Sequence, residues 1–206
     1  MLRPVKYNTI NSRGISGRPV RSGRSRIVIK LKKVRGTAWE KFMDTTQAIA
    51  VLENAVPEPA SGLPDDVFYY ISRVTPMINV DLLIKDQDGR TLMAWRTEQY
   101  WGNGWHLPGG IVRFRETLDT RIRKVAETEV GSTVEFEPEP LSITQLISNK
   151  RRTRGHFISL LYKCRLPAGF IPENKGLAET DSGYLRWFSG CPEDLFRTQE
   201  VYRKYI

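Results

Sequence analysis

The residues best suited to chemistry in this 206-residue chain lie between positions 109 and 131. Two adjacent glycines, Gly109 and Gly110, allow the backbone to turn sharply and to present its carbonyl and amide groups. A carboxylate follows at Glu129, far enough along a helix to meet a divalent cation beside the glycines. Magnesium prefers oxygen ligands and commonly keeps substrate phosphates in its coordination shell. The pattern therefore indicates a site where a metal ion neutralises the charge of a diphosphate.

The segment that carries these residues, 105–131, reads WHLPGGIVRFRETLDTRIRKVAETEVG and resembles the signature of the Nudix family. That signature is G-x5-E-x7-R-E-U-x-E-E-x-G-U, where U is a bulky aliphatic residue. Gly110, Glu116, Glu129 and Gly131 stand at their signature positions, and Lys124 stands at the arginine position. The resemblance implies a Nudix fold, which is an α/β (α+β) fold with a mixed β-sheet sandwiched between helices.

Three signature positions carry other residues, because Val125 and Thr128 replace glutamates and Ser132 replaces the closing aliphatic residue. Neither valine nor threonine can act as an ionised metal ligand. The GDP-mannose mannosyl hydrolase branch of the Nudix family shows similar replacements and keeps the last glutamate. That branch binds one magnesium ion through this glutamate and through the carbonyl of the first glycine of Pro-Gly-Gly. The resemblance thus implies one Mg²⁺ ion, with Mn²⁺ as the alternative, held by Glu129 and Gly109.

Residues outside the signature also resemble this branch, and the resemblance covers residues 63–206. A Thr-Pro-Met triplet at 75–77 precedes Asp81, Arg96 ends the return strand of a hairpin, and His156 begins a later strand. By this resemblance, Asp81 contacts the sugar and Arg96 helps to neutralise the diphosphate during catalysis. His156 would lie near the sugar or the phosphate. The branch also implies a homodimer.

Two departures from the branch bear on the chemistry. The arginine that follows Pro-Gly-Gly is replaced by Ile111, so Arg113 or Arg115 is expected to contact the substrate instead. The general-base histidine before the last strand is also missing. A carboxylate in the same region, Glu179 or Asp181, is the alternative base, and we take Asp181 as the candidate catalytic residue. A carboxylate has a lower ordinary pKa than histidine, so its pKa would have to be tuned for this role.

These residues predict a magnesium-dependent hydrolase acting on a nucleoside diphosphate linked to another moiety. The branch resemblance favours a nucleotide sugar of the GDP-mannose type, hydrolysed at the anomeric carbon to the sugar and a nucleoside diphosphate. Two alternatives stay open. One is pyrophosphatase attack at phosphorus on a nucleoside diphosphate derivative. The other is a catalytically silent domain that binds a nucleotide or associates with nucleic acid.

A helix and several strands must position these residues. Apolar residues at helical spacing predict a helix over 116–130, and Gly131 is a natural stop for it. The Gly- and Trp-rich stretch 101–110 is expected to be a loop. A hairpin turn is predicted at 86–89. Strands are predicted at 26–34, 76–85, 91–95, 141–148, 156–165 and 184–188, and further helices at 44–55, at 67–72 and from 192. Hairpins in place of regular βαβ alternation indicate a mixed α/β sandwich.

The N-terminal part differs in composition from the rest. Residues 1–36 hold eleven Lys and Arg and no acidic residue, whereas the other 21 basic residues of the chain face 23 acidic ones. This basic extension favours contact with a polyanion, such as nucleic acid or an anionic surface, with a solvated tail or an organelle-targeting peptide as alternatives. We expect a disordered tail at 1–25, a strand, helix and linker at 26–62, and the Nudix domain at 63–206.

Composition also argues against some classes of protein. No apolar run approaches the ~18 residues that a membrane-spanning helix needs. The beginning of the sequence lacks the apolar segment of a secretory signal. Cys164 and Cys191 are the only cysteines, without metal-binding spacing, which favours a reducing compartment. We therefore expect a cytoplasmic protein with no membrane span.

Overall fold

The computed structural model describes residues 44–98 and 102–206, so the basic extension and the strand predicted at 26–34 lie outside the described residues. Met43–Ile206 forms one compact unit. The predicted start of the Nudix domain at residue 63 stays a prediction, as do the polyanion contact and the homodimer. Among the described residues, no helix has the length and apolar character needed to cross a bilayer.

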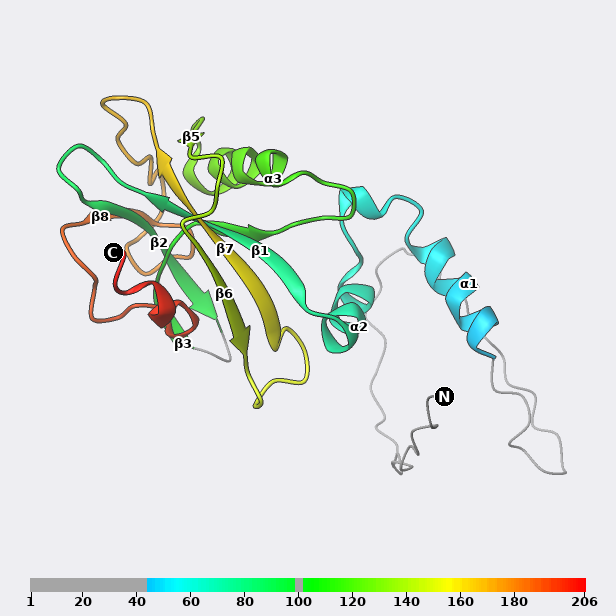
Figure 1. The fold of residues 1–206 in the computed structure, drawn as a ribbon. Helices are drawn as coiled ribbons and strands as arrows, with labels where there is room; N and C mark the ends of the chain where they lie inside the picture. Colours follow the sequence, from blue (N-terminus) through cyan, green and yellow to red (C-terminus); the bar gives the residue numbers. More distant parts are fainter. Residues whose placement is uncertain (1–43, 99–101) are drawn as a thin grey trace, which may run out of the picture. The chain divides into compact units, whose positions relative to one another are not determined.

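Two β-sheets form the centre of this unit (Figure 1). The larger sheet runs in the order β4 (Gly109–Ile111), β1 (Met77–Ile84) and β7 (His156–Arg165), and β7 also pairs with β5 (Glu135–Phe136) and β6 (Ser142–Ile147). The smaller sheet has the order β3 (Gly102–His106), β2 (Thr91–Glu98) and β8 (Leu185–Phe188). Strands β1 and β7 are parallel and the other pairs are antiparallel. The predicted mixed architecture is confirmed.

Strand β1 is buried on both faces, and its alternate residues serve two separate cores. Val80, Leu82 and Ile84 share one face and pack with residues of helix α3 (Leu118–Val125). Leu83 points to the other face and packs with residues of the smaller sheet. Asp81 shares this second face by alternation and is buried there. The fold thus places one carboxylate of the central strand in an apolar layer.

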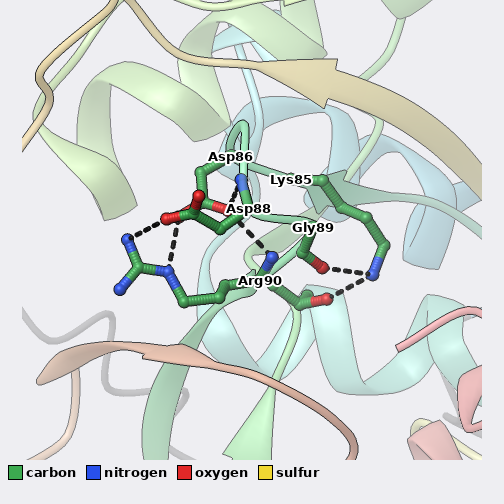
Figure 2. A network of polar contacts seen from close by, with 6 residues as sticks. Lys85, Asp86, Asp88, Gly89 and Arg90 are labelled. Atoms are coloured by element: carbon green, nitrogen blue, oxygen red, sulfur yellow. Dashed lines mark hydrogen bonds and ion pairs between the residues drawn. The ribbon is translucent and has the colours of Figure 1, made fainter.

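The turn between β1 and β2 joins the two sheets and is held by its own side chains (Figure 2). The Asp86 carboxylate accepts hydrogen bonds from the backbone amides of Asp88 (3.1 Å) and Arg90 (2.8 Å), and from Arg90 Nε (2.7 Å). Lys85 Nζ donates to the carbonyl of Gly89 at 3.2 Å. Aspartate favours turns because its short side chain satisfies nearby backbone amides. The predicted turn is confirmed, but β1 and β2 belong to different sheets and pair only at an isolated bridge between Lys85 and Thr91, so they do not form the expected hairpin.

The helices agree in part with the predicted ones. Helix α1 (Thr45–Ala55) begins at a capping box in which Asp44 and Gln47 bond reciprocally, and α2 (Asp65–Val74) extends beyond the predicted 67–72. The helix predicted at 116–130 is α3 followed by one π-helical turn, η2 (Ala126–Val130). Gly131 ends it with φ of 73°, as predicted. Short 3₁₀ turns complete the set at η1 (Pro59–Ser61) and η3 (Arg197–Tyr202).

Two predictions about elements are wrong. The stretch 101–110 is not a plain loop, because β3 lies within it and β4 begins at its end. Its Trp105 is buried against the smaller sheet, and pairing with β2 compensates for the weak strand propensity of the glycines. The terminal helix does not open at 192, since helical turns begin only at Arg197.

Candidate active site

A cleft of about 1470 Å³ lies where the ends of β1, β2 and β4 meet η3 and the β6–β7 loop. Asp81, Arg96 and Gly109 are among its lining residues, together with Gln199 and Tyr202. Three of the residues singled out in the sequence therefore come together in one concave site, although they lie on three different strands. Such a cleft with a few convergent polar groups is the usual form of a ligand site.

Asp81 is held at the floor of the cleft by three side chains. Its Oδ2 accepts hydrogen bonds from Ser159 Oγ and from Tyr202 Oη, both at 2.8 Å, and its Oδ1 lies 3.4 Å from Gln199 Nε2. Burial raises the pKa of Asp81, while these hydrogen bonds and the charge of Arg96 lower it. The carboxylate is fixed in position, so its predicted contact with a sugar would be made by a rigid group.

Gly109 is required by its close approach to Asp81. The two residues are cross-strand partners, and a Cβ at position 109 would collide with the Asp81 carboxylate. Gly110 is constrained from the other side, since a Cβ there would lie 2.8 Å from Val125 Cγ2. The two glycines do not form the sharp turn expected but lie on β4, packed between the buried carboxylate and helix α3. Val125, which replaces a glutamate of the signature, serves as a packing residue.

Glu129 is hydrogen-bonded to Gly109 of this segment. It lies on the π-helical turn η2, and its Oε2 accepts a hydrogen bond from the Gly109 amide at 3.1 Å. Burial raises the pKa of Glu129 to about 7, and the charge of Asp81 adds to the rise, whereas the Gly109 amide and Arg96 oppose it. Single π-helical turns occur frequently at functional sites. Glu129 does not line the cleft itself but contacts its wall through Gly109.

Arg96 is a cation whose charge acts on both Asp81 and Glu129. Its guanidinium lies 5.3 Å from the centre of the Phe196 ring, and its charge lowers the pKa of both Asp81 and Glu129. It also lowers the pKa of His106, which burial brings down to about 4. His106 is therefore neutral at pH 7, with Nδ1 bonded to the Ala94 carbonyl at 2.8 Å. Nothing in the sequence pattern indicated that this half-buried histidine would lie within the electrostatic reach of Arg96.

The donor set fits a magnesium ion that is completed by substrate. Asp81 and Glu129 carry two carboxylates against the single guanidinium of Arg96, and their mutual repulsion contributes to the raised pKa of Glu129. The described residues form no cluster of three or more His, Cys, Asp or Glu that could hold a metal alone. Magnesium commonly uses one or two carboxylates together with substrate phosphates. The use of the Gly109 carbonyl as a ligand stays a prediction.

The structural part of the signature differs from the prediction at one residue. Glu116 accepts hydrogen bonds from the Arg113 amide at 2.9 Å and forms an ion pair of 2.7 Å with Arg121, and both charged side chains are largely buried. Lys124, which stands at the arginine position of the signature, is instead exposed and pairs with Glu127 at 2.8 Å. Arg121, one helical turn earlier, therefore anchors Glu116, and Lys124 takes no part in this ion pair.

Three other candidate residues lie away from the Asp81 carboxylate. His156 is three positions before Ser159 on β7 and so faces the opposite side of the sheet, where its Nε2 lies 3.0 Å from Gln145 Nε2. Arg115 is exposed, with its guanidinium 5.0 Å from the Phe114 ring centre. Neither His156 nor Arg115 lines the cleft. Their predicted substrate contacts are not supported by these positions.

Asp181 also lies outside the cleft lining. Its Oδ2 accepts a hydrogen bond from the Ala178 amide at 2.8 Å, so the carboxylate closes its own turn. Its role as a catalytic base stays a prediction, which this position does not support. Arg113 does line the cleft, where its Nη1 donates to the Ser61 carbonyl at 2.9 Å.

The comparisons with known proteins agree with this geometry. The NUDIX domain family matches residues 75–203. The low-salt glycan biosynthesis protein Agl8 of Haloferax volcanii is 33% identical over 84 residues, which cover 41% of this chain and 53% of that protein. A MutT-like protein of Streptomyces ambofaciens is 28% identical over 127 residues, covering 61% of this chain and 71% of its own. The chain therefore spans about half the length of the first of these relatives.

Solved structures share the fold. A MutT NUDIX hydrolase from Burkholderia pseudomallei superposes with a TM-score of 0.51 at 21% identity, over 64% of this chain and 98% of that one. At this identity the likeness shows the fold alone. The family match covers well over half of the chain and includes the cleft residues Asp81, Arg96 and Gly109 as well as Glu129 beside them. The chain therefore belongs to the NUDIX domain family.

Proposed function

We propose that this protein is a divalent-metal-dependent hydrolase of a nucleoside diphosphate linked to another moiety, with a nucleotide sugar as the favoured substrate. The observation that carries the proposal is the bond between Glu129 and Gly109 beside buried Asp81 and Arg96. Two carboxylates near one guanidinium leave a site suited to a cation and a diphosphate. The name of the Haloferax relative, which refers to glycan biosynthesis, supports a sugar as the linked moiety.

Each residue then has a separate part in the reaction. A bound divalent ion would supply charge stabilisation for the departing diphosphate. Glu129 would bind that ion beside the Pro-Gly-Gly segment. Arg96 would pair with phosphate oxygens, for which the planar guanidinium is well suited. Asp81, fixed by Ser159 and Tyr202, would orient the linked moiety without losing side-chain entropy at each turnover.

The position of bond cleavage can be read from the products and from an oxygen label. With Mg²⁺ and GDP-mannose in ¹⁸O-water, we expect GDP and mannose, with the label in the mannose, because water would attack the anomeric carbon. Mass spectrometry of both products provides the measurement. Label in a phosphate, with GMP as product, would instead establish attack at phosphorus. Absence of turnover with all nucleotide sugars and dinucleotides offered would overturn the hydrolase proposal.

The role of Glu129 is tested by Glu129→Gln. We expect kcat/KM to fall by about 100-fold or more, because the neutral amide is a poor ligand for the ion that stabilises the leaving group. The matched control is Glu127→Gln, since Glu127 lies on the same turn but is exposed and pairs with Lys124. Steady-state kinetics across a magnesium titration measures both variants. Equal activity of Glu129→Gln and wild type would remove Glu129 from the site.

A further inference from the structure

A second group of charged residues lines the same cleft. Arg151 and Arg154 lie on the loop between β6 and β7, and Glu98 lies at the end of β2. Arg151 Nη2 is 3.1 Å from Glu98 Oε1, and the two side chains are only 18% and 16% exposed. The charge of Arg96 also acts on Arg154. Arg151 thus pairs with Glu98, and the charges of Arg96, Arg151 and Glu98 all act on Arg154 along this wall of the cleft.

Arg154 is held in place by several independent contacts. Its backbone has φ of 51°, which is uncommon for a residue other than glycine, and its amide donates to Ser72 Oγ on α2 at 3.1 Å. Its guanidinium lies 6.0 Å from the centre of the Phe68 ring. Unfavourable backbone conformations that a fold maintains cluster at ligand sites. The loop therefore presents this guanidinium in a fixed position.

The Arg154 guanidinium is short of partners. Its Nε is buried and has no hydrogen-bond partner among the described residues. Burial lowers the pKa of Arg154, and the charges of Arg96 and Arg151 lower it further, which means that the three cations repel one another. Glu98 offers only partial compensation. An oxyanion placed here would satisfy the buried N–H group and relieve the repulsion, because phosphoryl and carboxylate groups match the guanidinium fork.

We propose that Arg154, together with Arg151 and Arg96, forms a second oxyanion subsite that receives a phosphoryl or carboxylate group of the ligand in addition to the diphosphate. This inference rests on the proposed function, because the diphosphate bound near Glu129 defines the first subsite. The linked moiety of the substrate then carries an anionic group of its own. Arg96, which acts electrostatically on Glu129 as well as on Arg154, connects the two subsites.

Two pairs of probes separate the two sources of the anion. Pyrophosphate and tripolyphosphate differ by one phosphoryl group, and UDP-glucose and UDP-glucuronate differ by one carboxylate. Isothermal titration calorimetry at fixed free Mg²⁺ gives a Kd for each. We expect the more anionic member of at least one pair to bind about tenfold more tightly, as one additional charge-assisted contact would give. The pair that shows the preference identifies the chemical group.

Arg154→Asn is the informative variant, because asparagine tolerates a left-handed backbone and removes the charge without straining the loop. Arg154→Gly provides a second variant with the same backbone freedom. In both variants we expect the ratio of the two Kd values within the probe pair to fall close to one. The matched control is Arg186→Asn, since Arg186 is half-exposed, pairs with Glu179 at 3.8 Å and lies outside the cleft lining. It should keep the full preference, which excludes a general effect of net charge.

The possible outcomes distinguish the two proposals. Magnesium-dependent binding of pyrophosphate without any preference overturns the second subsite and leaves the proposed function intact. A preference that persists in Arg154→Asn and Arg154→Gly, or that disappears equally in Arg186→Asn, also overturns the subsite. Failure of the wild type to bind pyrophosphate with magnesium overturns both proposals.

Discussion

Gly109 and Asp81 show how closely single residues constrain this site. The glycine leaves the space that the Asp81 carboxylate occupies, and the same glycine bonds Glu129 through its amide. A side chain at position 109 would therefore disturb the central strand and the contact with Glu129 together. The requirement for glycine here comes from close approach and not from an unusual backbone angle.

This requirement predicts the effect of Gly109→Ala. The new Cβ would also lie 2.8 Å from the Val80 carbonyl, so we expect a loss of about 1–3 kcal/mol in the free energy of unfolding, as for other overpacked sites. Gly190→Ala is the control, because no atom lies within 4 Å of a Cβ there. Urea denaturation measures both variants. Equal stability of the two would show that β4 can move away from Asp81 without cost.

The sequence allowed prediction of those site residues that belong to a motif of neighbouring positions. Gly109 and Glu129 could be paired because both stand at positions of the signature that the segment resembles. The side chains that hold Asp81 could not, because Ser159 and Tyr202 are 78 and 121 residues away and have ordinary types for a strand and a helical turn. His156 was misplaced because the face of a strand changes with each residue.

At the scale of elements, α3 and the turn η2 form one continuous helical segment, the rod, on which Glu129 lies. The rod begins at Thr117, whose side chain accepts a hydrogen bond from the Thr120 amide, and it ends at Gly131. Its periodicity predicted the helix, but not the π-helical turn, because apolar spacing does not distinguish the two kinds of helical turn. The anchoring of Glu116 by Arg121 was missed for a similar reason.

The end of this rod gives a second stability prediction. Gly131 has φ of 73°, and a Cβ there would meet no atom within 4 Å, so Gly131→Ala should cost only backbone strain, about 1 kcal/mol. Gly131→Asn should cost less, since asparagine tolerates this conformation better. Thermal denaturation followed by circular dichroism compares them. An alanine variant as stable as the asparagine variant would contradict this account.

At the scale of the whole molecule, His106 couples folding to pH. Its pKa is about 4 in the folded protein, below the ordinary value of 6.5. Above pH 6.5 the imidazole is neutral in both states, and its contribution to stability is fully present. Between pH 6.5 and pH 4 only the unfolded chain takes up the proton, so the free energy of unfolding falls, by on the order of 3 kcal/mol in total.

The variant His106→Gln isolates this effect. It should lose less stability than wild type between pH 6.5 and pH 4, because glutamine does not titrate and retains an N–H donor for the Ala94 carbonyl. Glu129 acts in the opposite sense, since its raised pKa lets the folded protein take up a proton first. Glu129 takes up this proton in wild type and in His106→Gln alike. The difference between their pH profiles of stability therefore reports the contribution of His106. Parallel pH profiles in urea titrations would rule out the coupling.

Because the chain is synthesised from its N-terminus, Asp81 is made well before the residues that hold it. Its hydrogen-bond partner Tyr202 lies 121 residues later in the sequence. At a translation rate of about 5–20 residues per second, roughly 6–24 seconds separate the appearance of the two residues. Throughout that interval the nascent β1 carries a carboxylate whose future surroundings do not exist. The surroundings of Asp81 therefore close only after Tyr202 has been synthesised, as a late folding event.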